Sequence, residues 1–416
     1  MNKLTALALA ALLLLIPAGG VAANLTITPD HADGCYAVSE SVTWTVTGGT
    51  AETALPYTVR AGGLTEVAKG TLSFTDGKTK VTAKLDRPGA LLLTVALDEK
   101  KKVRGGAAVA WPEIKPSAPE PADFDSFWKE KLKELAAIPT NPLLEEVDSG
   151  VPEIRLWKIT MDNIRGTKIH GYLARSKGES PLPAMLQVQY AGVYALQKDW
   201  VLGPAKNGWL ALNIMAHDLP VDREKSFYEA QSNGPLKDYT TQGADDRDKS
   251  YFLRMYLSCY RAVDYLAGRS DWNKSTLVVQ GGSQGGMQGL ITAGLQPAVT
   301  VVTVDVPAGC DQTGGLVGRA IGFPWWTGNA ARTKTSGYYD PVNFAKRIRC
   351  PALVGMGLCD TICPPEGVFA MYNQITAPKR LVIMPAAEHV GWHAAYDTVR
   401  NSWWKAAASG TSLPMK

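Results

Sequence analysis

The sequence has few of the residues that mark metal-binding or disulfide-rich proteins. Its 416 residues include only five histidines and six cysteines. Cys359 and Cys363 are spaced like a loose metal pair, but no second cysteine or histidine pair accompanies them to complete a zinc site. We therefore expect no bound metal. In an oxidising compartment some cysteines can pair, but their spacing does not reveal which ones.

An excess of charge of one sign is also missing. The chain carries 43 basic and 39 acidic residues, for a formal net charge of +4. These charges are spread through the chain, without the basic block that follows a nucleic-acid backbone. We therefore expect no DNA or RNA partner. The 45% hydrophobic and 20% charged content is ordinary for a folded protein.

Long hydrophobic runs are restricted to the start of the chain. After Lys3, residues 4–16 are uncharged and mostly apolar, and small residues then continue to Ala23. This run is too short to span a bilayer, which takes ~20 residues. A basic start, a short apolar stretch and a small-x-small ending are typical of a secretory signal peptide. We expect residues 1–23 to be removed and the mature protein to be secreted or periplasmic, without a membrane span.

Short alternating segments follow this leader. Over residues 24–112, apolar residues recur at every second position in stretches such as "SVTWTVTGG" and "ALLLTVALDE", each closed by a turn residue. Strands of this length and spacing predict a small antiparallel sandwich, immunoglobulin-like in outline, of about 90 residues. It contains no evident chemistry, and we interpret it as a spacer or docking module.

The rest of the chain, residues 113–416, alternates strand and helix patterns. A proline-rich extended segment over 111–124 leads into an amphipathic helix, and a long helix is expected over 251–268. This alternation predicts an α/β domain with a mostly parallel sheet covered by helices on both faces. The strands are expected at 184–190, 209–215, 276–280, 299–305, 351–358 and 379–385.

One glycine-rich segment, "TLVVQGGSQGGMQGL", joins an expected strand to an expected helix. Gly281, Ser283 and Gly285 occupy the defining positions of G-x-S-x-G, the nucleophile elbow of the α/β-hydrolase fold. The turn is so sharp that side chains beside the serine would clash, and it directs the serine hydroxyl out of the sheet. It also directs the N–H of Gln284 toward the reacting carbonyl. The alternative is a phosphate-binding loop or a simple tight turn.

A nucleophilic serine needs a histidine base, and on this fold the partners follow in the order serine, acid, histidine. Two histidines lie beyond Ser283. His389 directly follows the expected strand 379–385, at the edge of the sheet where catalytic loops begin. His393 lies four residues later, at the start of the last helix, and is the alternative.

The acid that orients this histidine is expected at the end of another strand. Asp360 follows the buried strand 351–358, and Asp305 and Asp311 are its rivals one strand earlier. An oxyanion hole needs a second N–H from a loop after an early strand. Gly192 lies in such a loop, and the N–H of Val193 is our candidate; the alternative is that this loop only turns the chain.

Taken together, these motifs resemble the acetyl xylan esterase and cephalosporin-C deacetylase family of carbohydrate esterases. The chain has "GGSQGG" at the nucleophile, "GLCD" followed by "CPP" at the acid, and "EH" 29 residues after the acid. The segment "PEPADFDSFWKEKLKEL" is similar to the family's leading helix, so the likeness covers residues 113–416. Two motifs differ: "AGV" (191–193) replaces the family's H-G-Y, and "MAHD" (215–218) replaces R-G-Q.

The resemblance implies an α/β-hydrolase fold and a serine esterase that removes acetyl groups from sugars such as acetylated xylo-oligosaccharides. Ser283 would attack the acetyl carbonyl, with His389 as base and Asp360 holding its tautomer. No metal or organic cofactor is implied, and the family forms oligomers, often rings of six. Trp325 and Trp326 are candidates for stacking on a sugar, with burial in the core as the alternative.

Three other functions compete with this interpretation. A serine exopeptidase of the same fold also satisfies "GGSQGG", although the large β-propeller that usually precedes such enzymes does not fit into about 90 residues. A non-catalytic glycan-binding protein would have no need of Ser283, Asp360 and His389 together. A lipase is disfavoured because the resemblance indicates small acyl groups.

Overall fold

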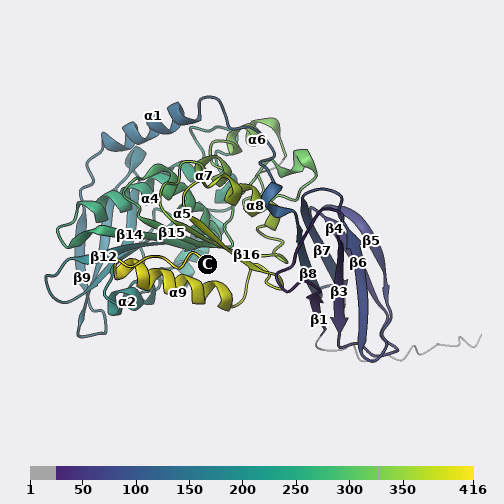
Figure 1. Ribbon diagram of the computed structural model, residues 1–416. Coiled ribbons are helices and arrows are strands. Elements are labelled where there is room, and N and C mark those ends of the chain that lie inside the picture. Colours follow the sequence, from purple (N-terminus) through teal and green to yellow (C-terminus); the bar gives the residue numbers. More distant parts are fainter. Residues whose placement is uncertain (1–24, 327) are drawn as a thin grey trace, which may run out of the picture.

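The computed structural model describes residues 25–326 and 328–416, which form a β-rich N-terminal part and a larger α/β part (Figure 1). The predicted signal peptide, residues 1–23, lies outside the described residues. No helix among the described residues is both long enough and apolar enough to cross a membrane.

Two small sheets that share one hydrophobic core make up the N-terminal part. The first has the order β1-β3-β6 and the second the order β2-β8-β7-β4-β5. Because side chains alternate along a strand, β3 and β7 each direct every second residue into the shared core, which includes Trp44 and Leu91. The strands are β1 (Thr26–Pro29), β2 (Cys35–Tyr36), β3 (Ser41–Thr47), β4 (Leu55–Ala61), β5 (Thr65–Leu72), β6 (Lys78–Lys84), β7 (Gly89–Ala96) and β8 (Lys102–Val109).

A nine-stranded sheet organises the α/β part. Neighbouring strands from β17 to β13 pair in parallel, whereas β11, β10 and β9 extend one edge by antiparallel pairing. In spatial order the strands are β17 (Lys379–Met384), β16 (Ala352–Gly357), β15 (Val301–Asp305), β14 (Trp272–Gly282), β12 (Leu182–Val188), β13 (Leu210–Ile214), β11 (Lys168–Ser176), β10 (Ile154–Asp162) and β9 (Leu143–Val147).

Helices cover both faces of this sheet (Figure 1). In β14, Leu277 and Val279 face a core shared with α4, α5, α7 and α8, whereas Val278 faces a core shared with α9. The helices are α1 (Phe124–Ala136), α2 (Asp199–Lys206), α3 (Lys225–Asn233), α4 (Tyr251–Gly268), α5 (Gln284–Leu295), α6 (Ala330–Ser336), α7 (Pro341–Ala345), α8 (Pro365–Gln374) and α9 (Ala394–Ala408).

The α/β class and the mostly parallel sheet predicted from the sequence are confirmed. Each of the six expected strands overlaps a strand of the sheet, and the helix expected over 251–268 has those bounds. The antiparallel strands β9, β10 and β11 were not identified from the sequence. The proline-rich segment predicted to be extended over 111–124 instead begins with a short 3-10 helix, Trp111–Glu113, and ends where α1 starts at Phe124. It packs on the α/β part, where the Ser117 hydroxyl donates to Asp311 at 2.5 Å.

Candidate active site

Ser283 lies on a sharp turn between β14 and α5. Its backbone has φ 54° and ψ −123°, a conformation that residues with side chains rarely adopt. The turn is fixed on both sides: the Ser283 N–H donates to the Asp305 carbonyl at 3.0 Å, and the Ser283 carbonyl accepts from Met287 and Ala308. Strain of this kind occurs where the surrounding structure over-determines the backbone, commonly at functional sites.

The glycines around Ser283 are required by close backbone packing. A Cβ on Gly281 would lie 2.5 Å from the Gly285 carbonyl, on the other side of the turn. A Cβ on Gly285 would lie 2.6 Å from the Val188 carbonyl oxygen at the end of β12. The glycines therefore let α5 start directly behind the serine and against the sheet, as the nucleophile-elbow interpretation requires.

His389 joins Ser283 to Asp360. The His389 Nε2 lies 2.9 Å from the Ser283 hydroxyl oxygen, and its Nδ1 lies 2.8 Å from Asp360 Oδ2. The other Asp360 oxygen accepts the N–H groups of Ile362 and Cys363, each at 2.8 Å. These bonds fix the orientation of the Asp360 carboxylate. Its Oδ2 therefore accepts a hydrogen bond from a protonated Nδ1 of His389, and the unprotonated Nε2 accepts the hydrogen bond of the Ser283 hydroxyl.

Two of the alternative candidates, His393 and Asp305, bind each other and form a separate pair. His393 Nδ1 lies 2.6 Å from Asp305 Oδ2, and its Nε2 donates to the Glu388 carbonyl at 3.0 Å. The hydrogen bond to Asp305 raises the pKa of His393. Asp311 is buried elsewhere, against Ser117 and Arg319. The structure thus brings Ser283, Asp360 and His389 together and directs the three rivals to other partners.

The loop expected to complete the oxyanion hole is tied to the elbow through Tyr239. The Gly192 N–H donates to the Tyr239 hydroxyl at 3.3 Å, and that hydroxyl donates to Gln284 Oε1 at 2.6 Å. Burial raises the pKa of Tyr239 to about 12, so the hydroxyl keeps its proton. Gln284 begins α5, where the first N–H groups have no partner within the helix. Val193 follows Gly192, whose φ of 120° few other residues tolerate.

His217 also supports this loop, in the segment where the family motif R-G-Q is replaced. Its side chain is fully buried. Its Nε2 donates to the Gly192 carbonyl at 3.0 Å, and its Nδ1 accepts from the Tyr251 hydroxyl at 2.7 Å. Sequence reasoning missed His217 and Tyr239 as supporting residues. For His217, the departure from the family motif was the available signal.

The protonation of His217 predicts a pH dependence of stability. Burial lowers its pKa to about 4, although its bond to the Gly192 carbonyl acts the other way. The unfolded value is about 6.5, so between these values the unfolded chain binds a proton that the folded chain excludes. As the pH falls from about 6.5 to 4, the free energy of unfolding should decrease by on the order of 3 kcal/mol from this group.

Urea unfolding of the wild type and of His217→Gln, measured from pH 7.5 to 4.5, checks this contribution. Glutamine can still donate to the Gly192 carbonyl but does not titrate, so the variant should lose less stability toward acid. Equal loss of stability in both proteins over this range would contradict the prediction.

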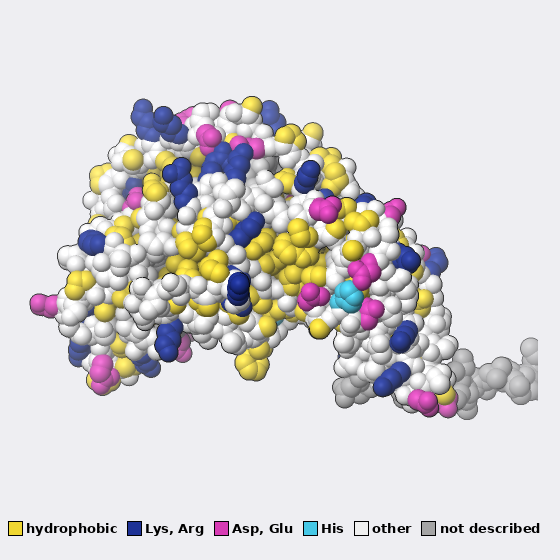
Figure 2. All heavy atoms as spheres, in the orientation of Figure 1, with side chains coloured by type: hydrophobic (Ala, Val, Ile, Leu, Met, Phe, Trp, Pro, Cys, Tyr) yellow, Lys and Arg dark blue, Asp and Glu magenta, His cyan; other side chains and the backbone are white. Residues whose placement is uncertain are grey.

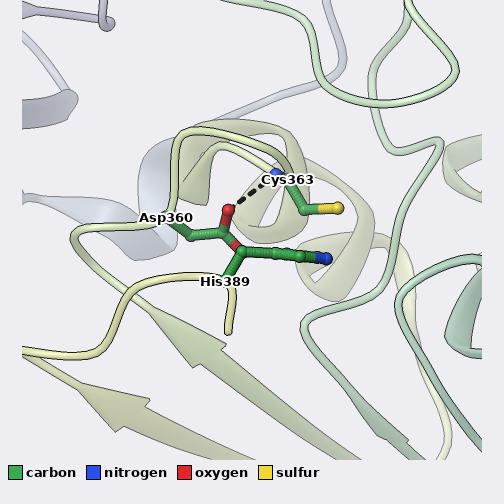
Figure 3. A group of neighbouring side chains, drawn as sticks. All are labelled: Asp360, Cys363 and His389. Atoms are coloured by element: carbon green, nitrogen blue, oxygen red, sulfur yellow. Dashed lines mark hydrogen bonds and ion pairs between the residues drawn. The ribbon is translucent and has the colours of Figure 1, made fainter. Parts of the chain in front are cut away.

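Cys363 is a further polar neighbour of Asp360 and His389. Figure 3 shows its thiol and the far end of the His389 ring pointing in the same direction, away from Asp360. Burial raises the pKa of Cys363 well above its ordinary value, and a side-chain contact with Ser283 acts in the opposite direction. The thiol therefore remains protonated and does not compete with Ser283 as a nucleophile.

Asp360, Cys363 and His389 also have donor atoms within 4.8 Å of one another, close enough to share a metal ion. Two of these donors already bind each other, since Asp360 Oδ2 faces His389 Nδ1. The second Asp360 oxygen is held by two backbone N–H groups, and the thiol is protonated. The donor set therefore fits an acid–histidine pair better than a metal centre.

The two candidate sugar-stacking tryptophans have different environments. Trp326 is only 2% exposed, packs against Phe252 and Tyr339, and donates its indole N–H to the Thr240 carbonyl. The expectation that Trp326 lines a pocket is therefore corrected, because this ring is part of the core. Trp325 is 46% exposed, and its neighbour Phe323 donates its N–H to the loop that follows Asp360.

Comparison with known proteins gives this geometry its context. The sequence model of the acetyl xylan esterase family (AXE1) matches residues 111–314 and 327–407. The chain belongs to the acetyl xylan esterase family. It is accordingly a carboxylic ester hydrolase with an α/β-hydrolase catalytic part.

Individual known proteins are similar to much of the chain. The acetyl esterase Axe7A of Xylanibacter ruminicola is 33% identical over 392 residues, which are 90% of this chain and 88% of that protein. The acetyl xylan esterase structure from Paenibacillus sp. R4 has 25% identity and a TM-score of 0.61, and covers 70% of this chain and 96% of its own. The enzyme from Thermoanaerobacterium sp. JW/SL YS485 has 23% identity and a TM-score of 0.59, with the same coverage.

Proposed function

We propose that this acetyl xylan esterase family member removes acetyl groups from sugars by a Ser283–His389–Asp360 mechanism with an acyl-enzyme. The observation that carries the proposal is the continuous hydrogen-bonded chain from the Ser283 hydroxyl through both nitrogens of His389 to Asp360. The serine at its end lies on a strained elbow, where its hydroxyl is directed out of the sheet.

In the first half of the reaction, Ser283 Oγ attacks the acetyl carbonyl carbon while His389 Nε2 takes the hydroxyl proton. Asp360 stabilises the imidazolium that forms and keeps Nδ1 protonated. The N–H groups of Gln284 and Val193 donate to the oxyanion of the tetrahedral intermediate. His389 then protonates the sugar oxygen as its bond to the acetyl carbon breaks, which leaves acetyl-Ser283.

In the second half, water attacks the acetyl group of the acyl-enzyme. His389 takes a proton from the water, and the same two N–H groups stabilise the second tetrahedral intermediate. The C–O bond to Ser283 breaks, the serine recovers its proton from His389, and acetate leaves. The proton transfers balance over the cycle, and each uses a side chain that the structure already brings together.

Acetylated xylo-oligosaccharides are the substrate that we propose. This substrate is supported by the family of the chain and by the names of three similar enzymes. One is named an acetyl esterase and two are named acetyl xylan esterases. Trp325 is the aromatic surface that we assign to a sugar ring, because it is half-exposed and lies on the segment beside the acid loop.

The domain plan and the cellular location belong to the same proposal. We assign residues 1–23 to a cleaved signal peptide, 24–112 to an immunoglobulin-like sandwich and 113–416 to the catalytic domain of a secreted or periplasmic enzyme. The family match starts at Trp111, close to the second boundary. Mass spectrometry of the exported protein should give an N-terminus at Asn24, and light scattering should detect the oligomer that the family resemblance implies.

The experiment that tests the function is a measurement of acetate release from acetylated xylan, xylose tetraacetate, cephalosporin C and a 4-nitrophenyl ester series. We expect kcat/KM on the acetyl ester to exceed that on the octanoyl ester by on the order of 100-fold, because a small acyl site rejects long chains. Peptide anilides serve as the comparison substrates for an exopeptidase.

Cleavage of peptide anilides without acetate release would replace the esterase proposal by the exopeptidase. A fluorophosphonate probe separates the remaining alternative, because it labels only a serine that is activated for attack. Absence of any covalent adduct on folded protein would indicate a glycan-binding protein instead of an enzyme.

A further inference from the structure

The loop that carries Asp360 packs against two glycines of the N-terminal part, Gly106 in β8 and Gly34 just before β2. A Cβ on Gly106, in β8, would lie 2.4 Å from both the Cβ and the carbonyl oxygen of Leu358. A Cβ on Gly34, whose φ is +67°, would lie 2.8 Å from the Leu358 side chain and 3.3 Å from Pro385. Leu358 is two residues before Asp360, so this backbone contact lies directly beside the acid.

The loop that carries His389 is held by the same strand. Arg104, two residues before Gly106 in β8, forms an ion pair with Glu388 at 2.8 Å, and its side chain is 20% exposed. Glu388 directly precedes His389, and its carbonyl accepts from His393. The residue before the histidine is therefore held from the N-terminal sheets and from the start of α9.

The two loops are also bonded to each other. The Cys359 N–H donates to the Ala387 carbonyl at 3.0 Å, and the Leu358 N–H donates to the Met384 carbonyl at 3.1 Å. A displacement of either loop is thus transmitted to the other. Since His389 must stay within hydrogen-bond reach of both Ser283 and Asp360, such a displacement affects the whole chain of proton transfer.

Two further hydrogen bonds join the N-terminal part to the α/β part. Glu366, in the first turn of α8, is 2% exposed and accepts the N–H of Ala90 in β7 at 2.6 Å. The Ala320 N–H donates to the Gly62 carbonyl at 2.7 Å. A cavity of about 140 Å³ between the two parts is lined by both Leu91 and Asp360, so a loop released from its contacts has space to move into.

Figure 1 places β7 and β8 beside the end of β16, and Figure 2 shows the two parts in continuous contact above a notch. We propose that the N-terminal sheets position the loops of Asp360 and His389, with Arg104 and Gly106 as positioning residues. This inference rests on the proposed function. The sheets precede the family match, which starts at Trp111, so this device is an addition to the catalytic part.

A pair of neighbouring glycines provides the first test. Gly106→Ala places its Cβ against the backbone of Leu358, whereas Gly105→Ala places its Cβ 2.4 Å from the Ile27 side chain, within the N-terminal core. We expect Gly106→Ala to lower kcat on 4-nitrophenyl acetate by about tenfold with little change in KM, because small displacements at a catalytic site are costly. Gly105→Ala should lower Tm by about 5 °C and leave kcat nearly unchanged.

The ion pair provides a second test that does not depend on a clash. Arg104→Gln and Glu388→Gln should each lower kcat and the rate of fluorophosphonate labelling of Ser283 by about fivefold. The exchanged pair Arg104→Glu with Glu388→Arg should recover most of this loss. Lys102→Gln is the control, because Lys102 is exposed and two residues away on the same strand.

The outcomes separate positioning from simple stabilisation. A lower Tm with unchanged kcat in Arg104→Gln and Gly106→Ala would overturn the inference, and so would an equal fall in kcat for Gly105→Ala and Gly106→Ala. If Gly106→Ala does not fold, the kcat values of Arg104→Gln and Glu388→Gln decide whether the N-terminal sheets position the two loops. A wild-type protein that releases no acetate overturns the proposed function, whereas an active wild type with unaffected ion-pair variants overturns only the positioning role.

Discussion

Replacing Ser283 by alanine is expected to lower kcat for acetyl ester hydrolysis by on the order of 10⁴-fold or more. The variant loses the atom that attacks the acetyl carbon, and the His389 Nε2 loses its 2.9 Å partner. Residual turnover would come from substrate binding and the oxyanion hole alone. The measurement is initial-rate kinetics on 4-nitrophenyl acetate, with fluorophosphonate labelling as the second readout.

Ser275→Ala is a matched control for this variant, because Ser275 is exposed on the same strand, β14, at the end away from the elbow. It should retain the activity of the wild type. Substantial turnover by Ser283→Ala, or labelling of a different residue, would remove Ser283 from the mechanism.

Asp360→Asn is expected to have the second largest effect, a fall in kcat on the order of 10³- to 10⁴-fold. Asparagine can turn its amide N–H₂ toward His389 Nδ1, which favours the tautomer with the proton on Nε2. That tautomer cannot accept the Ser283 proton. The fold should be retained, because asparagine has nearly the same shape and can still accept the N–H groups of Ile362 and Cys363.

Asp305→Asn is the decisive comparison, because Asp305 also bonds a histidine but that histidine is His393. We expect it to lower kcat by less than about tenfold, since it disturbs only a residue that supports the loop. If Asp305→Asn were the more damaging change, the assignment of the acid to Asp360 would be wrong.

Much of the α/β part could be predicted because its signals are local. The strand expected over 276–280 lies inside β14, and the helix 251–268 was predicted with its observed bounds, since an 18-residue amphipathic pattern is hard to confuse with a strand. Strand β8 was missed, because Gly105 and Gly106 interrupt its alternation of apolar and polar residues. Those glycines are there for close packing against Ile27 and Leu358.

For the candidate site, the sequence predicted the types of the three residues and their order along the chain. The elbow follows from local spacing, and the requirement for a later acid and histidine follows from the chemistry of serine activation. Six combinations of Asp305, Asp311 or Asp360 with His389 or His393 satisfied that order. The support of the oxyanion loop by Tyr239 was not predictable, because Tyr239 lies on a segment that carries no motif. For His217, the departure from the family motif at 215–218 marked the segment, but not the contact with Gly192.

Local sequence thus decided that this chain has a strained serine between a strand and a helix, in an α/β sheet. Contacts between distant segments decided which acid meets which histidine, that Trp326 is buried, and that the N-terminal sheets reach the loops of Asp360 and His389. The physical reason is that a turn depends on the φ/ψ values of a few adjacent residues. The meeting of two side chains depends on strand order, register and packing across the whole sheet.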